Sequence, residues 1–205
     1  MNSSKLINQI YAYLGFHSMQ KDEQTDSLIA QCLDELKGIA HFRYIYKYFQ
    51  TPPDFLKCSP YEEYLKGSSG VFLSVMTLGT EADAKIKFYS RTDAAKALVF
   101  DACASAYLEY LSDDYEKGLG DNLSYRFCPG YGGSDVGDLR FIFGLVKPEK
   151  IGVTLNSTNY MLPSKSMAGI IAVGAENEKS CKSCVLSAHC EYLKRGEKCY
   201  GSEKR

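Results

Sequence analysis

A turn that follows an arginine carries the residue types best suited to binding a small charged ligand. The segment Arg126-Phe-Cys-Pro-Gly-Tyr131 places a guanidinium at the expected end of a short strand, with a Pro-Gly turn directly after it. An arginine offers two parallel N–H donors to a carboxylate or phosphate, and a Pro-Gly turn exposes backbone groups that suit the edge of a base. The loop therefore predicts a site for a zwitterionic, nucleotide-like ligand. The alternative is that Arg126 pairs with a nearby acid such as Asp121, and that the Pro-Gly is merely a turn.

The last 25 residues contain a second candidate site, made of four cysteines. Short loops bring thiolates together at small entropic cost, and thiolates bind soft cations and iron–sulfur clusters. The Cys-x2-Cys-x5-Cys part resembles the auxiliary clusters of some radical-type enzymes, so we expect a [4Fe-4S] cluster. Zinc is the alternative, with His189 as a further ligand, although zinc sites usually pair two short knuckles. An unmetallated tail is the third reading. The four cysteines are Cys181, Cys184, Cys190 and Cys199.

Other reactive residue types do not form a catalytic set. Cys103 lies on the apolar stripe of a predicted helix, where a small core residue is expected. His17 and His41 have no neighbouring Ser, Cys or ligand-like spacing, so no catalytic triad is predicted. The glycines after Arg126 lack the Gly-Lys-Ser/Thr of a P-loop, and no GxGxxG begins a helix. Neither familiar phosphate motif is present.

Composition and charge exclude several classes of protein. The chain has 205 residues, 24 Lys+Arg against 25 Asp+Glu, and a net charge of -1, which makes nucleic acid an unexpected partner. No apolar run approaches the ~20 residues that cross a bilayer, and the N-terminus does not resemble a signal peptide. We therefore expect a cytoplasmic protein without a membrane partner, in which cysteines are reduced or metal-bound. The composition changes near Ala175, so we expect a globular body over residues 1–175 and a cysteine-rich tail over residues 176–205.

Hydrophobic periodicity predicts the elements that position these residues. Residues 92–115 should form the central core helix, because Ala95, Leu98, Val99, Ala102, Ala106 and Tyr110 make an apolar stripe. Helices and strands are mixed without regular strand-helix-strand units, which favours an α+β fold with a mainly antiparallel sheet. Further helices are expected over 4–16, over 26–40 and from Ser134 or Asp135 to Val146. Another should begin at Thr80, which with Asp83 three residues on resembles an N-cap arrangement. Strands are expected over 41–50, 71–78, 124–127, 151–155 and 166–173.

Three motifs in this order resemble a known family. Arg-x-x-x-Gly-Tyr at 126–131 is followed by Ile-Gly-Val-Thr-Leu at 151–155 and Met-Leu-Pro-Ser-Lys-Ser-Met-Ala-Gly at 161–169. Together they resemble the reactivation (S-adenosylmethionine-binding) domain of cobalamin-dependent methionine synthase, and the likeness covers roughly residues 5 to 175. It implies a C-shaped α+β domain built around a twisted antiparallel sheet, with S-adenosylmethionine in a shallow groove.

The resemblance also implies site residues. Arg126 would bind the methionyl carboxylate, and the backbone around Cys128, Gly130 and Tyr131 would contact the adenosine. The Tyr131 ring would face the sulfonium, or else pack over the turn.

Two departures from the family pattern affect the expected site. The family's long helix carries a Glu near the ligand amine, whereas the equivalent position here is Ser105, and Glu109, one turn later, is expected to be a solvated helix residue. In addition, the chain enters its cysteine tail where the family continues with tyrosines that approach the ligand. Ligand affinity is then lower, or is completed by a partner.

The function implied by the resemblance is that of a stand-alone reactivation subunit. It would support reductive methylation of Co(II) cobalamin on a cobalamin-dependent methionine synthase, a methyltransferase reaction within methionine biosynthesis. The electron would come from flavodoxin or ferredoxin, and the tail cluster would relay it. One alternative is reductive activation of another corrinoid methyltransferase protein. The other is an iron–sulfur electron-transfer protein that does not bind S-adenosylmethionine.

Overall fold

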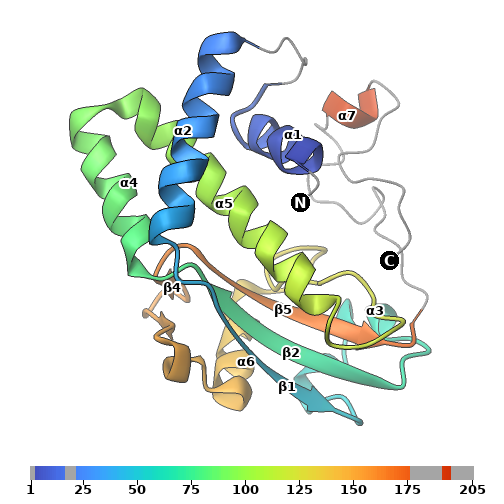
Figure 1. Cartoon of the computed structure of the whole chain (residues 1–205). Coiled ribbons are helices and arrows are strands. Elements are labelled where there is room, and N and C mark those ends of the chain that lie inside the picture. The colour runs from blue at the N-terminus through green and yellow to red at the C-terminus, as the bar shows by residue number, and fades with distance from the viewer. Residues whose placement is uncertain (1–2, 17–21, 176–190, 195–205) are drawn as a thin grey trace.

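The computed structural model describes residues 3–16, 22–175 and 191–194, and its centre is a three-stranded antiparallel sheet (Figure 1). The strand order is β1-β2-β5, with β1 at Arg43–Phe49, β2 at Gly70–Thr77 and β5 at Ser166–Val173. The middle strand β2 is buried along nearly its whole length, as expected for an apolar run covered on both faces. Residues Ser74 and Gly169 lie opposite each other in the β2–β5 register.

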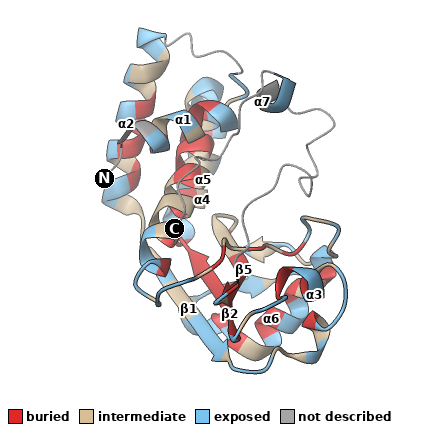
Figure 2. Cartoon of the chain, turned by 90° about the vertical axis from the view of Figure 1, so that its right-hand side faces the viewer, coloured by how far each residue is buried: buried red, intermediate tan, exposed pale blue. Residues whose placement is uncertain are grey.

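Helices cover both faces of this sheet. Four of them, α1 (Ser3–Tyr13), α2 (Glu23–Ile39), α4 (Thr80–Thr92) and α5 (Ala94–Glu116), form a layer on one side (Figure 1). The short helices α3 (Tyr61–Tyr64) and α6 (Leu139–Val146) lie on the other (Figure 2). The remaining elements are the 3-10 helices at Asp54–Leu56, Val136–Asp138 and Pro148–Ile151, the two-stranded sheet of β3 (Thr154–Leu155) and β4 (Met161–Leu162), and α7 (Glu191–Lys194).

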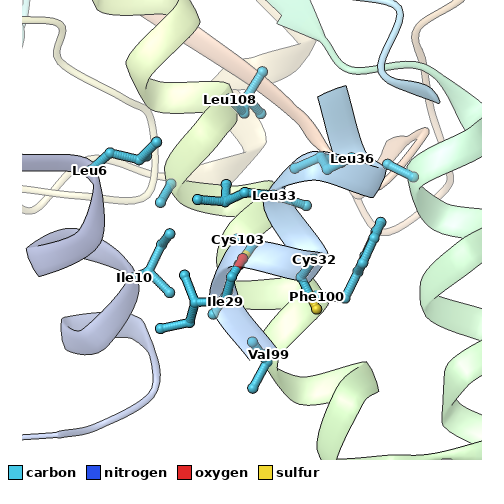
Figure 3. Close-up of a cluster of buried hydrophobic side chains, with 14 of the residues drawn as sticks. Leu6, Ile10, Ile29, Cys32, Leu33, Leu36, Val99, Phe100, Cys103 and Leu108 are labelled. Carbon is cyan, nitrogen blue, oxygen red and sulfur yellow. The ribbon is translucent and has the colours of Figure 1, made fainter. Parts of the chain in front are cut away.

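The long helix α5 is the core of the helical layer, as predicted. Figure 3 shows Val99 and Cys103 of α5 directed toward α1 and α2, among side chains that include Cys32 of α2. Both cysteines are fully buried, and burial raises the pKa of Cys32 to about 11 and that of Cys103 to about 12. The thiols are therefore protonated at neutral pH, and the prediction that Cys103 is a core residue is confirmed.

The predicted helix over 92–115 is confirmed as α5, which begins at Ala94 and ends at Glu116. Asp93 separates α4 from α5 in an extended conformation, and its side chain accepts a hydrogen bond from the backbone N–H of Lys96, which caps α5. The first turn of the predicted apolar stripe is not buried, because Ala95 is exposed and Leu98 is 62% exposed. The stripe becomes a core face only from Val99 onward.

The predicted N-cap arrangement of Thr80 and Asp83 is wrong in detail. Helix α4 begins at Thr80, but the residue at its N-cap is Gly79, and Asp83 does not bond back to Thr80. Asp83 instead accepts hydrogen bonds from the Ser164 backbone N–H at 2.5 Å and from the Ser164 hydroxyl at 2.6 Å, which ties α4 to the segment before β5.

The segments predicted as strands at 151–155 and 124–127 are mostly irregular. Left-handed residues at Lys147 (φ 60°) and Gly152 (φ 77°) bend the chain, so that 148–151 is a 3-10 helix and only 154–155 pairs as a strand. Leu123 and Phe127 make only isolated bridges to β5. The predicted α+β class and antiparallel sheet are nevertheless confirmed.

None of the helices within the described ranges is both long and apolar enough to span a membrane. The boundary proposed near residue 175 stays a prediction, since residues 176–190 and 195–205 lie outside the described part of the chain.

Candidate functional site

Arg126 reaches its position through contacts with β5. The bridge between Phe127 and Ile170 holds its segment beside that strand. The buried Tyr64 hydroxyl strengthens this pairing, because it donates to the backbone carbonyl of Ile170 at 3.0 Å and accepts from the backbone N–H of Ala172. The Arg126 side chain then lies over Gly169, since a Cβ atom at residue 169 would come within 2.5 Å of the Arg126 Cδ. Glycine at this position is therefore required for the arginine to cross the sheet.

The guanidinium of Arg126 ends between two acids at the C-terminal end of α5. Its Nη1 donates to the carboxylate of Glu116, which is fully buried, and its Nη2 donates to Asp113 Oδ1 at 3.2 Å. The Tyr44 hydroxyl also donates to Glu116, at 3.2 Å. The Arg126 side chain is 7% exposed. Burial opposes its charge, but the carboxylate of Glu116, together with Cys128 and Asp113, raises the pKa of Arg126 overall.

Pairing of Arg126 with an acid is thus observed, as the alternative interpretation of the sequence predicted. The acids are Glu116 and Asp113, however, whereas Asp121 is exposed in the following turn. A guanidinium has five N–H donors, and these two ion pairs occupy one on each Nη. The role predicted for Arg126 in binding a ligand carboxylate stays a prediction.

The loop after Arg126 is shaped by glycines and by its own hydrogen bonds. Gly130 has a φ of 91°, a left-handed conformation that side chains other than glycine rarely adopt. Its N–H donates to the Ser134 hydroxyl at 3.0 Å, and the Tyr131 N–H donates to the Cys128 carbonyl at 3.2 Å. These two N–H groups are engaged inside the loop, so contacts to a base would come from the other backbone groups. The Tyr131 side chain is 62% exposed at the surface.

The structure brings Glu109, and not Ser105, toward this loop. The Ser105 hydroxyl accepts a hydrogen bond from Lys165 Nζ at 3.0 Å, so a cation of the chain already stands there. Glu109 accepts hydrogen bonds from Gln9 Nε2 at 2.6 Å and from the Tyr13 hydroxyl. Partial burial is the largest cause of the raised pKa of Tyr131, followed by the electrostatic influence of Cys128 and then by that of Glu109.

Sequence reasoning therefore missed Glu109, which it assigned to solvent. A signal was present, because Asp101, Ser105, Glu109 and Asp113 recur every four residues and so share one face of α5. Along that face, Asp101 pairs with Lys165, Glu109 accepts hydrogen bonds from α1, and Asp113 pairs with Arg126.

Surface hollows occur elsewhere on the described part of the chain. One of about 490 Å³ is lined by His41, Phe42, Arg43, Thr80 and Glu81. Another, of about 640 Å³, is lined by Pro52, Leu56, Lys57, Glu62, Glu63, Leu65 and Lys66. Neither includes Arg126 or the loop after it, so neither is the shallow groove that the family resemblance implies.

The described residues contain no group of three or more His, Cys, Asp or Glu side chains arranged to hold a metal ion. The predicted cluster ligands Cys181, Cys184, Cys190 and Cys199 all lie outside the described residues, as does His189.

Comparison with known proteins gives a match among solved structures. No protein-family model matches the chain, and no curated protein sequence matches it. Among solved structures, the chain is similar to the MetH reactivation domain bound to AdoHcy, with a TM-score of 0.56 and 16% sequence identity over 86% of this chain and 73% of that chain. The resemblance inferred from three short motifs is thus confirmed at the level of the fold, and the chain has the fold of the MetH reactivation domain.

Proposed function

We propose that the chain binds S-adenosylmethionine beside Arg126 and serves as a stand-alone reactivation subunit for a cobalamin-dependent methionine synthase. The observation that carries this proposal is a contact between two of the sequence motifs, in a fold similar to that of a known reactivation domain. Arg126 of the first motif lies directly over Gly169 of the last, in a fold similar to that of a reactivation domain bound to AdoHcy. A cytoplasmic location, as the sequence predicts, suits this role.

The polar residues suit the parts of such a ligand. The Nη2 of Arg126, which pairs with Asp113 in this structure, would bind the ligand carboxylate, and Glu109, which accepts from Gln9 and Tyr13, would bind the ammonium. The backbone of Cys128 and Gly130 would contact the adenosine. The exposed ring of Tyr131 would face the sulfonium, an interaction worth about 0.5–2 kcal/mol.

The charge of the site favours a cationic ligand. Two carboxylates, Asp113 and Glu116, pair with the single guanidinium of Arg126, and Glu109 lies one turn before Asp113 on α5. S-adenosylmethionine carries one carboxylate, one ammonium and one sulfonium, so its net positive charge complements this excess of acids.

The chain contributes to the reaction by positioning the bound ligand. When bound, S-adenosylmethionine would supply its sulfonium methyl to the partner's corrinoid, which would take one electron from the donor, and a thioether would remain on the chain. The residues around Arg126 fix the ligand so that its methyl is presented outward, toward a corrinoid on another polypeptide.

Ligand binding is tested by titrating S-adenosylmethionine calorimetrically into the wild type and Arg126→Gln. Loss of a charge-assisted pair to the carboxylate should weaken binding by at least about tenfold. The titration is run well below the unfolding transition of the variant, because Arg126 also has buried partners. Equal heats in the two proteins would reject the proposed loop as the binding site.

The partner is tested separately, by anaerobic reactivation. A methionine synthase without its own reactivation domain is prepared as Co(II), then mixed with S-adenosylmethionine, the chain, and flavodoxin or ferredoxin. Conversion of the corrin absorbance to the methylated form should depend on the chain. The same assay with a different corrinoid methyltransferase protein distinguishes the alternative in which the chain activates another partner.

The tail carries a further part of the proposal. Cys181, Cys184, Cys190 and Cys199 would hold a [4Fe-4S] cluster that relays the electron, with zinc as the alternative metal. Iron, sulfide and zinc contents of anaerobically purified protein distinguish these readings. A colourless, iron-free protein that still supports reactivation would eliminate the relay, whereas an iron-loaded protein that gives no heat with S-adenosylmethionine would favour a pure electron-transfer protein.

A further inference from the structure

Two acids, three residues apart on α5, hold the same guanidinium from different depths. Glu116 is fully buried and holds Nη1 of Arg126, whereas Asp113 is 30% exposed and holds Nη2. We propose that Glu116 is a permanent positioning residue for Arg126, and that Asp113 is a built-in stand-in for the ligand carboxylate, which displaces it. The inference rests on the proposed function, because it assigns a mode of regulation to the same site.

The Glu116 side chain is fully buried, and its carboxylate accepts hydrogen bonds from both Arg126 and Tyr44. Removing a buried carboxylate from its cation is strongly unfavourable. Glu116 therefore stays in place, and it keeps the guanidinium oriented whether or not a ligand is bound.

Asp113 is less deeply buried than Glu116. Its side chain is 30% exposed, and its distance of 3.2 Å to Nη2 is at the long end of the range for an N–H···O hydrogen bond. A rotation of its side chain would return the carboxylate to water. The ligand carboxylate can then accept a hydrogen bond from Nη2 in place of Asp113, so that Arg126 still pairs with two carboxylates.

The position of Arg126 does not depend on Asp113. Its aliphatic stem lies on Gly169, and its inner nitrogen is held by Glu116. Loss of Asp113 therefore leaves the guanidinium where it is and frees one donor. A ligand must compete with Asp113 for that donor. The apparent affinity of the ligand therefore falls in proportion to the fraction of molecules in which Asp113 has released Nη2.

The test compares Asp113→Ala with Asp114→Ala by calorimetric titration of S-adenosylmethionine. Asp114 is a matched control, because it is the next residue on α5, is 64% exposed and pairs with Lys117 at 3.5 Å. Both substitutions remove one negative charge, which by itself weakens binding of a cationic ligand. We expect Asp113→Ala to bind about three- to tenfold more tightly than the wild type, and Asp114→Ala to bind equally or slightly less tightly.

A second ligand shows whether the carboxylate causes the gain. 5′-Methylthioadenosine has the nucleoside and thioether but lacks the amino-acid group, so its affinity should not rise in Asp113→Ala. The inference is overturned if Asp113→Ala binds S-adenosylmethionine no more tightly than Asp114→Ala, or if both ligands gain equally. If the wild type and all variants bind neither ligand, the proposed function itself fails.

The positioning role of Glu116 predicts the opposite sign. Glu116→Gln should weaken S-adenosylmethionine binding by about tenfold or more, while circular dichroism reports whether the variant is folded. If it does not fold, Tyr44→Phe takes its place, since it removes one of the donors to Glu116 and should weaken binding about two- to threefold. Tighter binding by a folded Glu116→Gln, or by Tyr44→Phe, would refute the division of roles between the two acids.

Discussion

The substitution Gly169→Ala should destabilise the protein far more than an added methyl group normally does. A Cβ at this position would lie 2.5 Å from the Arg126 Cδ and would also overlap its Cγ, whereas carbon atoms in contact are about 3.5–4.0 Å apart. The backbone cannot relieve this overlap, because β5 is paired with β2 on one side and bridged to Phe127 on the other. Arg126 must therefore move.

The size of the effect follows from what Arg126 leaves behind. Overpacking alone costs about 1–3 kcal/mol, but displacement of the guanidinium also strands the fully buried carboxylate of Glu116. Breaking one partner out of a buried ion pair costs about 3–5 kcal/mol. We therefore expect Gly169→Ala to lower the free energy of unfolding by about 3–5 kcal/mol, measured by urea denaturation followed by far-ultraviolet circular dichroism.

Two further variants separate this cause from a general intolerance of alanine. Gly144 lies in α6 with open space around its Cα, so Gly144→Ala should be neutral or stabilise by up to about 1 kcal/mol. Combining Gly169→Ala with Glu116→Gln should cost less than the sum of the two single changes, because no charge is stranded in the double variant. A cost below about 1 kcal/mol for Gly169→Ala, or strict additivity in the double variant, would refute the reasoning.

Two other predictions concern the supports of the site and of the helical layer. Tyr64→Phe removes the buried hydroxyl that accepts from the Ala172 N–H, and it should lower the free energy of unfolding by about 1–3 kcal/mol in the same urea assay. Burial opposes ionisation of Glu35, but Lys85 and Tyr89 hold its pKa below the ordinary value of 4.5. Its stabilising contribution is therefore present above about pH 4.5 and is lost as the pH falls through the lowered pKa, so Glu35→Gln should flatten the loss of stability below pH 4.5. An equally steep loss in both proteins would contradict this assignment.

The parts of the fold set by local pattern were predictable from the sequence. Residues 166–173 were predicted as a strand and form β5 with the same bounds, because a β-branched apolar run fits a buried strand. Separate helices were predicted from Thr80 and over 92–115, and they form α4 and α5 on either side of Asp93. Leu98 shows a limit of the pattern, because periodicity gives a helix its apolar face but not the point at which neighbouring elements stop covering it.

The partners of Arg126 show why a site is harder to predict than a fold. The nearest acid in the sequence, Asp121, was the wrong choice. A chain that turns back after a long helix passes the end of that helix, so the acids that meet Arg126 come from its last turns, at Glu116 and Asp113. Their contact depends on the crossing of α5 over the sheet, which no local pattern encodes.

A buried arginine that is paired within its own chain is compatible with a binding site when its pairs differ in depth. If Arg126 were only structural, both of its acids would support the same ion pair, and removing either would leave S-adenosylmethionine binding unchanged. If it binds a carboxylate, the deep acid Glu116 organises the guanidinium and the shallow acid Asp113 competes for it. Structural support alone cannot make a substitution improve ligand affinity. The sign of the Asp113→Ala effect, tighter or not, therefore decides between the two roles of Arg126 more directly than removal of the arginine itself, which would damage the protein in either case.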